Sequence, residues 1–300
     1  VDVSSPIPDE AWRCSGIQQF EQAFYRFIFY QLAHLALQNA RTELLRGLEQ
    51  LEQMIQWAQS DSQVRASRAA EVQRIRQEQL EMIEEFEVQA AFVAVKKELE
   101  ELLYYVRQRL FLRVPDFFQD AFSSIGEGSR PAREQLQQAL ERMLHETAKD
   151  LEQEIRATAL RVERFVWKQV QKVQENIQER IALHDPHCRI ALLPASSLEI
   201  PEVPGSLSLM LEEDWKPVLS IYKNARAFYE QGGSTRMREA LMRQMERPVQ
   251  RYLEQMQEHL NRYYGDWMKQ LLDQVKQSAR QDVDAYFSGL ADALNEQGQL

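Results

Sequence analysis

The sequence predicts an all-α fold, an elongated antiparallel bundle of about four long helices with a short tip of helices and loops at one end. Gly and Pro are few for the length, ten of each in 300 residues. Apolar residues recur at helical spacing over four long runs. At 1.5 Å per residue, runs of about 45 to 65 residues would be roughly 65 to 100 Å long, so they must pack side by side.

Composition narrows the functional class. With 36 Lys and Arg against 46 Asp and Glu, the net charge is -10, which disfavours non-specific binding to nucleic acid. The two cysteines, Cys14 and Cys188, are too few for a disulfide framework and favour a reducing compartment, the cytosol. Because Val1 is not a start methionine and the next residues are polar, the sequence reads as a piece of a longer protein.

The first half of the chain contains two predicted helices. Residues 1–11 are a short stretch with β-branched residues followed by serines and prolines. This composition is typical of the last strand and loop of an upstream domain. Residues 12–60 form the first helix, and 61–114 form the second, because Ser60 and its neighbours supply a helix stop and a new helix start. The second helix is expected to end before Pro115.

The second half contains two more predicted helices. Residues 115–129 are expected to form an aromatic corner that closes the end of the bundle. The helix over 130–184 has the clearest apolar stripe, with Leu151 and Ile155 in its core. Residues 185–233 form a tip-like segment. The last helix spans 234–300, where Pro248 should kink it or mark a junction between two pieces.

The predicted tip segment is unusually apolar and aromatic for a connection between helices, so it needs a partner. Between Trp215 and Arg251 the sequence has eight cations and three anions, a local charge of +5 that suits anionic lipid headgroups. The alternative is that these arginines pair with neighbouring glutamates while the aromatic residues close the bundle. The candidate contact residues are Leu207, Leu209, Met210, Leu211, Trp215, Lys216, Leu219, Tyr222, Lys223, Arg226, Phe228 and Tyr229.

Sequence motifs of common catalytic sites are absent. The sequence has no phosphate-binding loop, no serine nucleophile elbow and no zinc-protease helix motif. His184, Asp185, His187 and Cys188 could ligate a metal, but their spacing fits no standard site and an ordinary helix terminus explains them better. We therefore expect no catalytic, cofactor-binding or metal-binding residue in this chain, and no enzymatic activity of its own.

Three stretches carry a resemblance to a known family. Val1–Ser5 look like the final strand and guanine-contacting loop of a GTPase domain, and Ser15–Ile28 are similar to a motif that leads into a first neck helix. Tyr222–Glu230 resemble an element that joins a membrane-facing tip to a trunk helix. Together these features resemble the bacterial dynamin-like proteins, in the part that follows their GTPase domain.

This resemblance implies a helical stalk that couples nucleotide-driven movement to membrane binding, remodelling and self-assembly. Residues 1–11 would then be the remnant of the GTPase domain, and GTP and Mg²⁺ would bind upstream. The implied partners are that domain, an anionic membrane surface at the inner face of the cell membrane, and a homo-oligomer or tandem copy. Glu212–Asp214 and Lys216 interrupt the apolar tip and favour surface contact over deep insertion.

Hinges of such a stalk are expected where the helices break. The candidate hinge residues are Ser15, Gly16, Ser60, Pro115, Gly126 and Gly128. The alternative function is a structural or adaptor coiled-coil protein that binds other helices through exposed faces. That alternative explains the periodicity equally well, but not the strand-like first residues or the motif at Ser15 and Gly16.

Overall fold

A computed structural model describes residues 16–58, 62–123, 125, 132–194 and 201–296. Within these ranges the chain is almost entirely helical and has no strand, as the sequence predicts. The chain divides into two compact units. The first takes the described residues of Val1–Gln79, His184–Arg189 and Val283–Leu300, and the second takes those of Leu80–Leu183 and Ile190–Asp282.

The first unit begins with a long exposed helical run. It consists of α2 (Ile17–Arg26), a π-helical turn, η1 (Phe27–Leu32), and α3 (Ala33–Ala58). None of the side chains described between residues 17 and 56 is buried. The expected burial of this helix in a bundle is therefore not seen. The unit also contains most of α4 (Ser62–Glu84) and the end of α10 (Gly233–Glu296).

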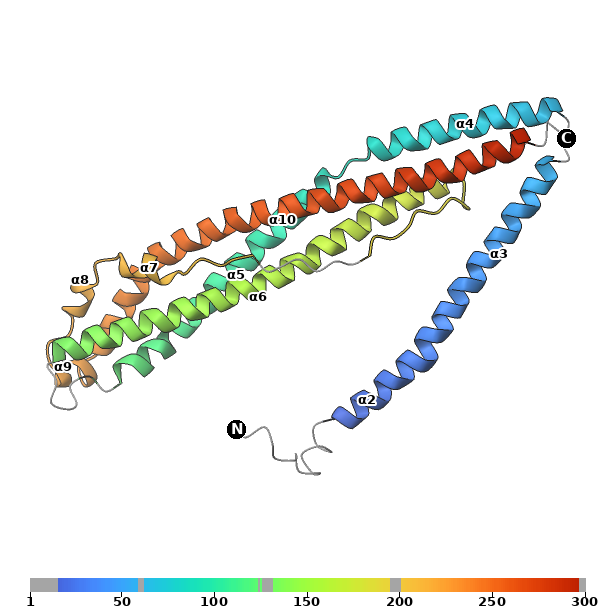
Figure 1. Cartoon of the computed structure of the whole chain (residues 1–300). Coiled ribbons are helices and arrows are strands. Elements are labelled where there is room, and N and C mark those ends of the chain that lie inside the picture. The colour runs from blue at the N-terminus through green and yellow to red at the C-terminus, as the bar shows by residue number, and fades with distance from the viewer. Residues whose placement is uncertain (1–15, 59–61, 124, 126–131, 195–200, 297–300) are drawn as a thin grey trace. The chain divides into compact units, whose positions relative to one another are not determined.

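The second unit is built on three long helices that lie side by side, α5 (Gln89–Phe122), α6 (Ala132–Ala182) and most of α10 (Figure 1). Hydrogen bonds join α6 to α10 and α5 to α10, through Tyr264 Oη to the Ala159 carbonyl (2.7 Å) and Gln257 to Glu100 (3.3 Å). The α6 stripe from Leu136 to Ile181 forms its core, and Leu151 and Ile155 are fully buried.

One helix break was not predicted and one predicted break is absent. The helix expected over 61–114 is divided at residues 85–88, between α4 and α5. By contrast, α5 continues through Pro115 to Phe122, so the prediction of a corner starting at 115 is wrong for its first eight residues. Val114, Phe118 and Phe122 are buried around this proline. Their packing outweighs the roughly 3 kcal/mol that proline costs inside a helix.

The described parts of the segment between α6 and α7 both contact the second unit. Near its start, the Ile190 amide donates to Gln178 Oε1 (2.9 Å). Near its end, the Ser206 amide donates to Glu152 Oε1 (3.0 Å) and Tyr252 Oη donates to the Pro204 carbonyl (2.8 Å). The start of the segment therefore lies beside the C-terminal part of α6 and its end lies nearer the N-terminus of that helix.

The connection between α6 and α10 gives a topology that differs from the expected one. The sequence predicted antiparallel neighbours throughout and one tip-like segment over 185–233. In the structure α5 and α6 are antiparallel, since Arg109 pairs with Glu154 and Arg113 with Asp150. Helices α6 and α10, however, run in the same direction side by side (Figure 1), with Tyr264 against Ala159 and Trp267 against Trp167. Of the predicted tip-like segment, only residues 207–233 lie at the end of the second unit where α6 begins. We call these residues the tip.

Candidate functional site at the tip

The tip consists of three short helices, α7 (Leu207–Leu211), α8 (Lys216–Leu219) and α9 (Ala225–Tyr229). Pro217 lies at the start of α8, where its missing N–H costs nothing. Asn224 precedes α9, and its side-chain oxygen accepts a hydrogen bond from the Ala227 amide (2.8 Å). Gly233 begins α10 so close to α9 that a Cβ there would lie 2.7 Å from the Ala227 carbonyl oxygen. These residues fix the tight turns of the tip.

Four of the large apolar side chains of the tip point inward. Met210 and Phe228 are 1% exposed and Trp215 is 7% exposed. The indole Nε1 of Trp215 donates to the Met210 carbonyl (2.9 Å), so its one polar group is satisfied inside the tip. Val218, which the sequence analysis did not select, is buried with them. These residues therefore form a small core that closes the end of the second unit.

Tyr229 fastens the tip to the end of α5. Its hydroxyl lies 3.0, 3.0 and 3.1 Å from the carbonyl oxygens of Phe122, Ser123 and Ile125. These carbonyls lie at the end of α5 and just beyond it, where no further helical turn is present to bond with them. The ring of Tyr229 stays 45% exposed. The hydroxyl thus has a structural role, while the ring is left at the surface.

The remaining predicted contact residues lie at the surface or half-buried. Leu211 is 52% exposed. The charged residues Lys216, Lys223 and Arg226 are exposed, and Leu207, Leu209, Leu219 and Tyr222 are half-buried. The structure therefore divides the predicted set into an inward apolar group and an outward, mainly cationic group.

Two of the four acidic residues of the tip are paired with one arginine. Arg251 Nη1 lies 3.7 Å from Glu212 and its Nη2 lies 3.9 Å from Glu213. Within single helices, Arg226 pairs with Glu230 and Arg243 with Glu239. Five cations near the tip have no ion pair among the described residues, and none of them is buried: Lys216, Lys223, Arg236, Arg238 and Arg247. These five side chains are therefore available to a partner.

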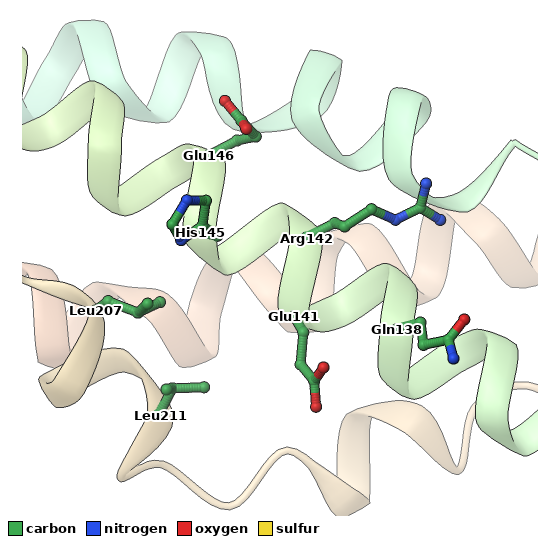
Figure 2. A pocket seen from close by; sticks show the side chains of 7 residues that line it. All are labelled: Gln138, Glu141, Arg142, His145, Glu146, Leu207 and Leu211. Atoms are coloured by element: carbon green, nitrogen blue, oxygen red, sulfur yellow. The ribbon is translucent and has the colours of Figure 1, made fainter.

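A surface groove of about 830 Å³ runs beside the tip, between α6 and α7. Leu207 and Leu211 form one edge, and polar residues of α6 form the other (Figure 2). Among these, Arg142 donates to the Ala121 carbonyl at 3.4 Å. No sequence signal pointed to this groove, because its two edges lie more than sixty residues apart in the chain. The polar edge consists of Gln138, Glu141, Arg142, His145 and Glu146.

The residues weighed as metal ligands form a turn in the first unit. Asp185 accepts hydrogen bonds from the His187 amide (2.8 Å) and the Tyr286 hydroxyl (2.9 Å), so both of its carboxylate oxygens are occupied. Cys188 is buried. No group of His, Cys, Asp or Glu that could hold a metal is found in the described part of the chain. The hydrogen bonds of Asp185 give this turn a structural explanation.

The expected hinges are described only in part. Gly16 precedes α2 with a φ of 71°, a left-handed conformation that favours glycine. Pro115 lies inside a continuous helix, so it does not mark a break. Ser15, Ser60, Gly126 and Gly128 lie outside the described residues.

Comparison with known proteins yields no match to a family model, a curated protein or a solved structure. Among the helices that the structure describes, none combines the length and the apolar character needed to span a bilayer.

Proposed function

We propose that the tip binds an anionic membrane surface peripherally and that the helices behind it act as a stalk. The observation that carries this proposal is the group of five cations near the tip that lack an ion pair among the described residues. Each Lys or Arg near an anionic bilayer contributes about 1 kcal/mol, so five together are enough for measurable, salt-sensitive binding.

The burial of the aromatic residues supports contact rather than insertion. Trp215 and Phe228 are used inside the tip, and inserting them into lipid would require the tip core to open. Leu211 and the ring of Tyr229 are the large apolar groups of the tip that stay exposed, and both lie at its surface. Binding should therefore depend mainly on charge, with Leu211 adding a small apolar contact.

Co-sedimentation with vesicles tests this proposal. The chain should pellet with vesicles of phosphatidylserine and phosphatidylcholine, stay in the supernatant with phosphatidylcholine alone, and dissociate as salt is added. The triple variant Lys216→Glu, Lys223→Glu, Arg247→Glu should weaken binding by at least about 100-fold, since three lost contacts are worth about 3 kcal/mol before repulsion is counted.

The matched control reverses three exposed cations away from the tip, Arg161→Glu, Arg164→Glu and Lys269→Glu. Both triple variants have the same net charge, so a general charge effect would weaken both equally. Equal weakening, or equal binding to both vesicle types, would contradict the proposal. Trp215→Glu is unsuitable as a test because it places a charge in the core of the tip.

The larger role, the stalk of a dynamin-like GTPase, rests on the resemblance of Ser15–Ile28 and Tyr222–Glu230 to that family. It predicts a phosphate-binding loop roughly 200 to 300 residues before Val1, the length of one large domain. It also predicts that the present chain does not hydrolyse GTP while the longer protein does. If the longer sequence lacked that loop, the proposal of a GTPase stalk would be wrong, while the proposal of membrane binding would stand.

One observation favours the adaptor function as a second candidate. The helical run from α2 to α3 exposes fourteen large apolar side chains, a surface that suits binding to other helices. An adaptor would bind through this face and would not need the cations of the tip. Loss of vesicle binding in the tip triple variant would favour the membrane-binding function over the adaptor function.

A further inference from the structure

Helix α3 carries an exposed apolar seam with coiled-coil spacing. Leu37, Leu44, Leu48, Leu51 and Ile55 recur at intervals of seven, four, three and four residues, and each is between 56% and 71% exposed. The remaining seam position between Leu37 and Leu44 is Arg41, which is also exposed. We call these six residues the α3 seam. Its alternating spacing is the pattern by which two helices interlock their side chains.

The exposed apolar surface is too large for a single soluble helix. Fourteen large apolar side chains between Ile17 and Ile55 are at least 40% exposed. At roughly 100 Å² each they amount to roughly 1,400 Å², against about 300–600 Å² for the largest patch of a typical monomer. A standard interface buries about 800 Å² from each partner, and the five apolar residues of the α3 seam, at the same roughly 100 Å² each, supply about 500 Å² of it.

The seam of α3 is distinct from the aromatic stripe of α2. Phe20 and Phe24 stack with their rings 5.8 Å apart on α2. The π-helical turn η1 then adds residues to the helical turn and shifts the register before α3 begins. As a result, Leu35 lies on the opposite side of α3 from Leu44 and Leu51, although it is equally exposed at 55%. The regular seam is therefore confined to α3.

The charges along the seam select the occupant and its direction. Arg41 lies toward the N-terminal end of the seam, and Glu49 and Glu52 lie toward its C-terminal end; none of the three has an ion pair among the described residues. A parallel pair of α3 helices would put Arg41 opposite Arg41 of the partner subunit, which is unfavourable. An antiparallel pair that aligns Leu44 with Leu48 of the partner subunit puts Arg41 beside Glu52 of the partner subunit.

We propose that α3 pairs with α3 of a second copy of this chain to form an antiparallel two-stranded coiled coil. The seam leucines form its apolar layers, and Arg41 forms a flanking ion pair with Glu52 of the partner subunit at each end. The pairing needs no lipid, so dimer formation and vesicle binding fail or succeed independently.

Sedimentation velocity of the full 300-residue chain over a range of concentrations tests the proposal. We expect a concentration-dependent dimer. Leu44→Glu and Leu48→Glu should each raise the dimer dissociation constant by roughly 30-fold or more, as for the central apolar residues of other interfaces. Leu35→Glu is the matched control, and it should leave the dissociation constant unchanged. Circular dichroism checks that each variant retains the helical content of the parent chain.

A charge swap tests the direction. Arg41→Glu and Glu52→Arg should each weaken the dimer, and the double variant Arg41→Glu, Glu52→Arg should restore it. A parallel dimer would show no restoration, because each residue would then face its own equivalent. A chain that stays monomeric at all concentrations, or a dimer that survives Leu44→Glu, would overturn the pairing.

Discussion

Among individual residues, the clearest electrostatic feature is a cluster of four charges between α5 and α6. Arg109 and Arg113 both bind Glu154, at 2.6 and 2.7 Å, and Arg113 also binds Asp150 at 2.8 Å. The second oxygen of Asp150 is buried without a hydrogen-bond partner. Both carboxylate oxygens of Glu154 therefore have an arginine partner, whereas only one oxygen of Asp150 has one.

The two carboxyl groups respond to this environment in opposite ways. Burial raises the pKa of Asp150, and the nearby charge of Arg113 offsets this only in part. Burial also opposes ionisation of Glu154, but its hydrogen bonds to Arg109 and Arg113 and their charges outweigh burial, so its pKa is lowered. Ionised Glu154 thus stabilises the fold above its unfolded pKa near 4.5, while ionised Asp150 costs stability at the same pH.

Glu154→Gln should therefore lower the free energy of unfolding by about 1–3 kcal/mol at neutral pH, because two charge-assisted hydrogen bonds lose their charged acceptor. This loss should shrink as the pH falls below 4.5 through the lowered pKa of Glu154. Urea unfolding at neutral and acidic pH measures it. Asp150→Asn is the control and should have the opposite trend, being most favourable relative to the parent chain at neutral pH. Equal effects of the two substitutions would show that the cluster does not distinguish them.

Residue identity alone predicted which side of α6 is buried, but not which way the tip residues point. A stripe along a long helix is fixed by helical geometry. Leu211 is the last residue of α7 and Trp215 precedes α8, and nothing local distinguishes the buried residue from the exposed one. The difference arises because Trp215 reaches the carbonyl of Met210 inside the tip.

At the level of helices, α6 is the element that the sequence predicts best, and its core makes a direct stability test. Leu151→Ala or Ile155→Ala should lower the free energy of unfolding by about 2–5 kcal/mol, because both side chains are fully buried and truncation leaves a cavity. Leu160→Ala on the same helix is the control and should cost far less, since Leu160 is 42% exposed. Equal losses at Leu151 and Leu160 would mean that the core face is misassigned.

The breaks between helices were harder to predict because contacts between distant residues decide them. No glycine or proline lies at residues 85–88, where α4 ends and α5 begins. Phe86 is 9% exposed there, and the guanidinium carbon of Arg180 lies 4.9 Å from the centre of its ring. This contact joins residues almost a hundred positions apart. At Pro115 the reverse holds, because buried neighbours keep the helix continuous through a residue that usually ends one.

At the level of the whole molecule, the two compact units should differ in stability. The second unit has a continuous core, whereas the described side chains of α2 and α3 are not buried. Helices without tertiary packing are only marginally stable in water. We therefore expect the run from α2 to α3 to gain stability from the proposed pairing with a second copy of the chain.

Thermal unfolding followed by circular dichroism should accordingly show two steps. The first step, loss of helix in α2 and α3, should move to higher temperature as protein concentration rises, because a dimer dissociates as it melts. The second step should not depend on concentration. Leu44→Glu should abolish the concentration dependence of the first step and leave the second unchanged. A single transition would instead indicate that both units unfold together.

The shared direction of α6 and α10 also has a consequence for the electrostatics of the tip. Both helices begin at the end of the second unit where the tip lies. The peptide dipoles of a helix sum to about half a positive charge at its N-terminus, so two long helices direct this partial charge toward the tip and only α5 opposes them. An antiparallel α6 and α10 would have cancelled this field. The direction of the backbone thus favours anions at the same end as the unpaired lysines and arginines.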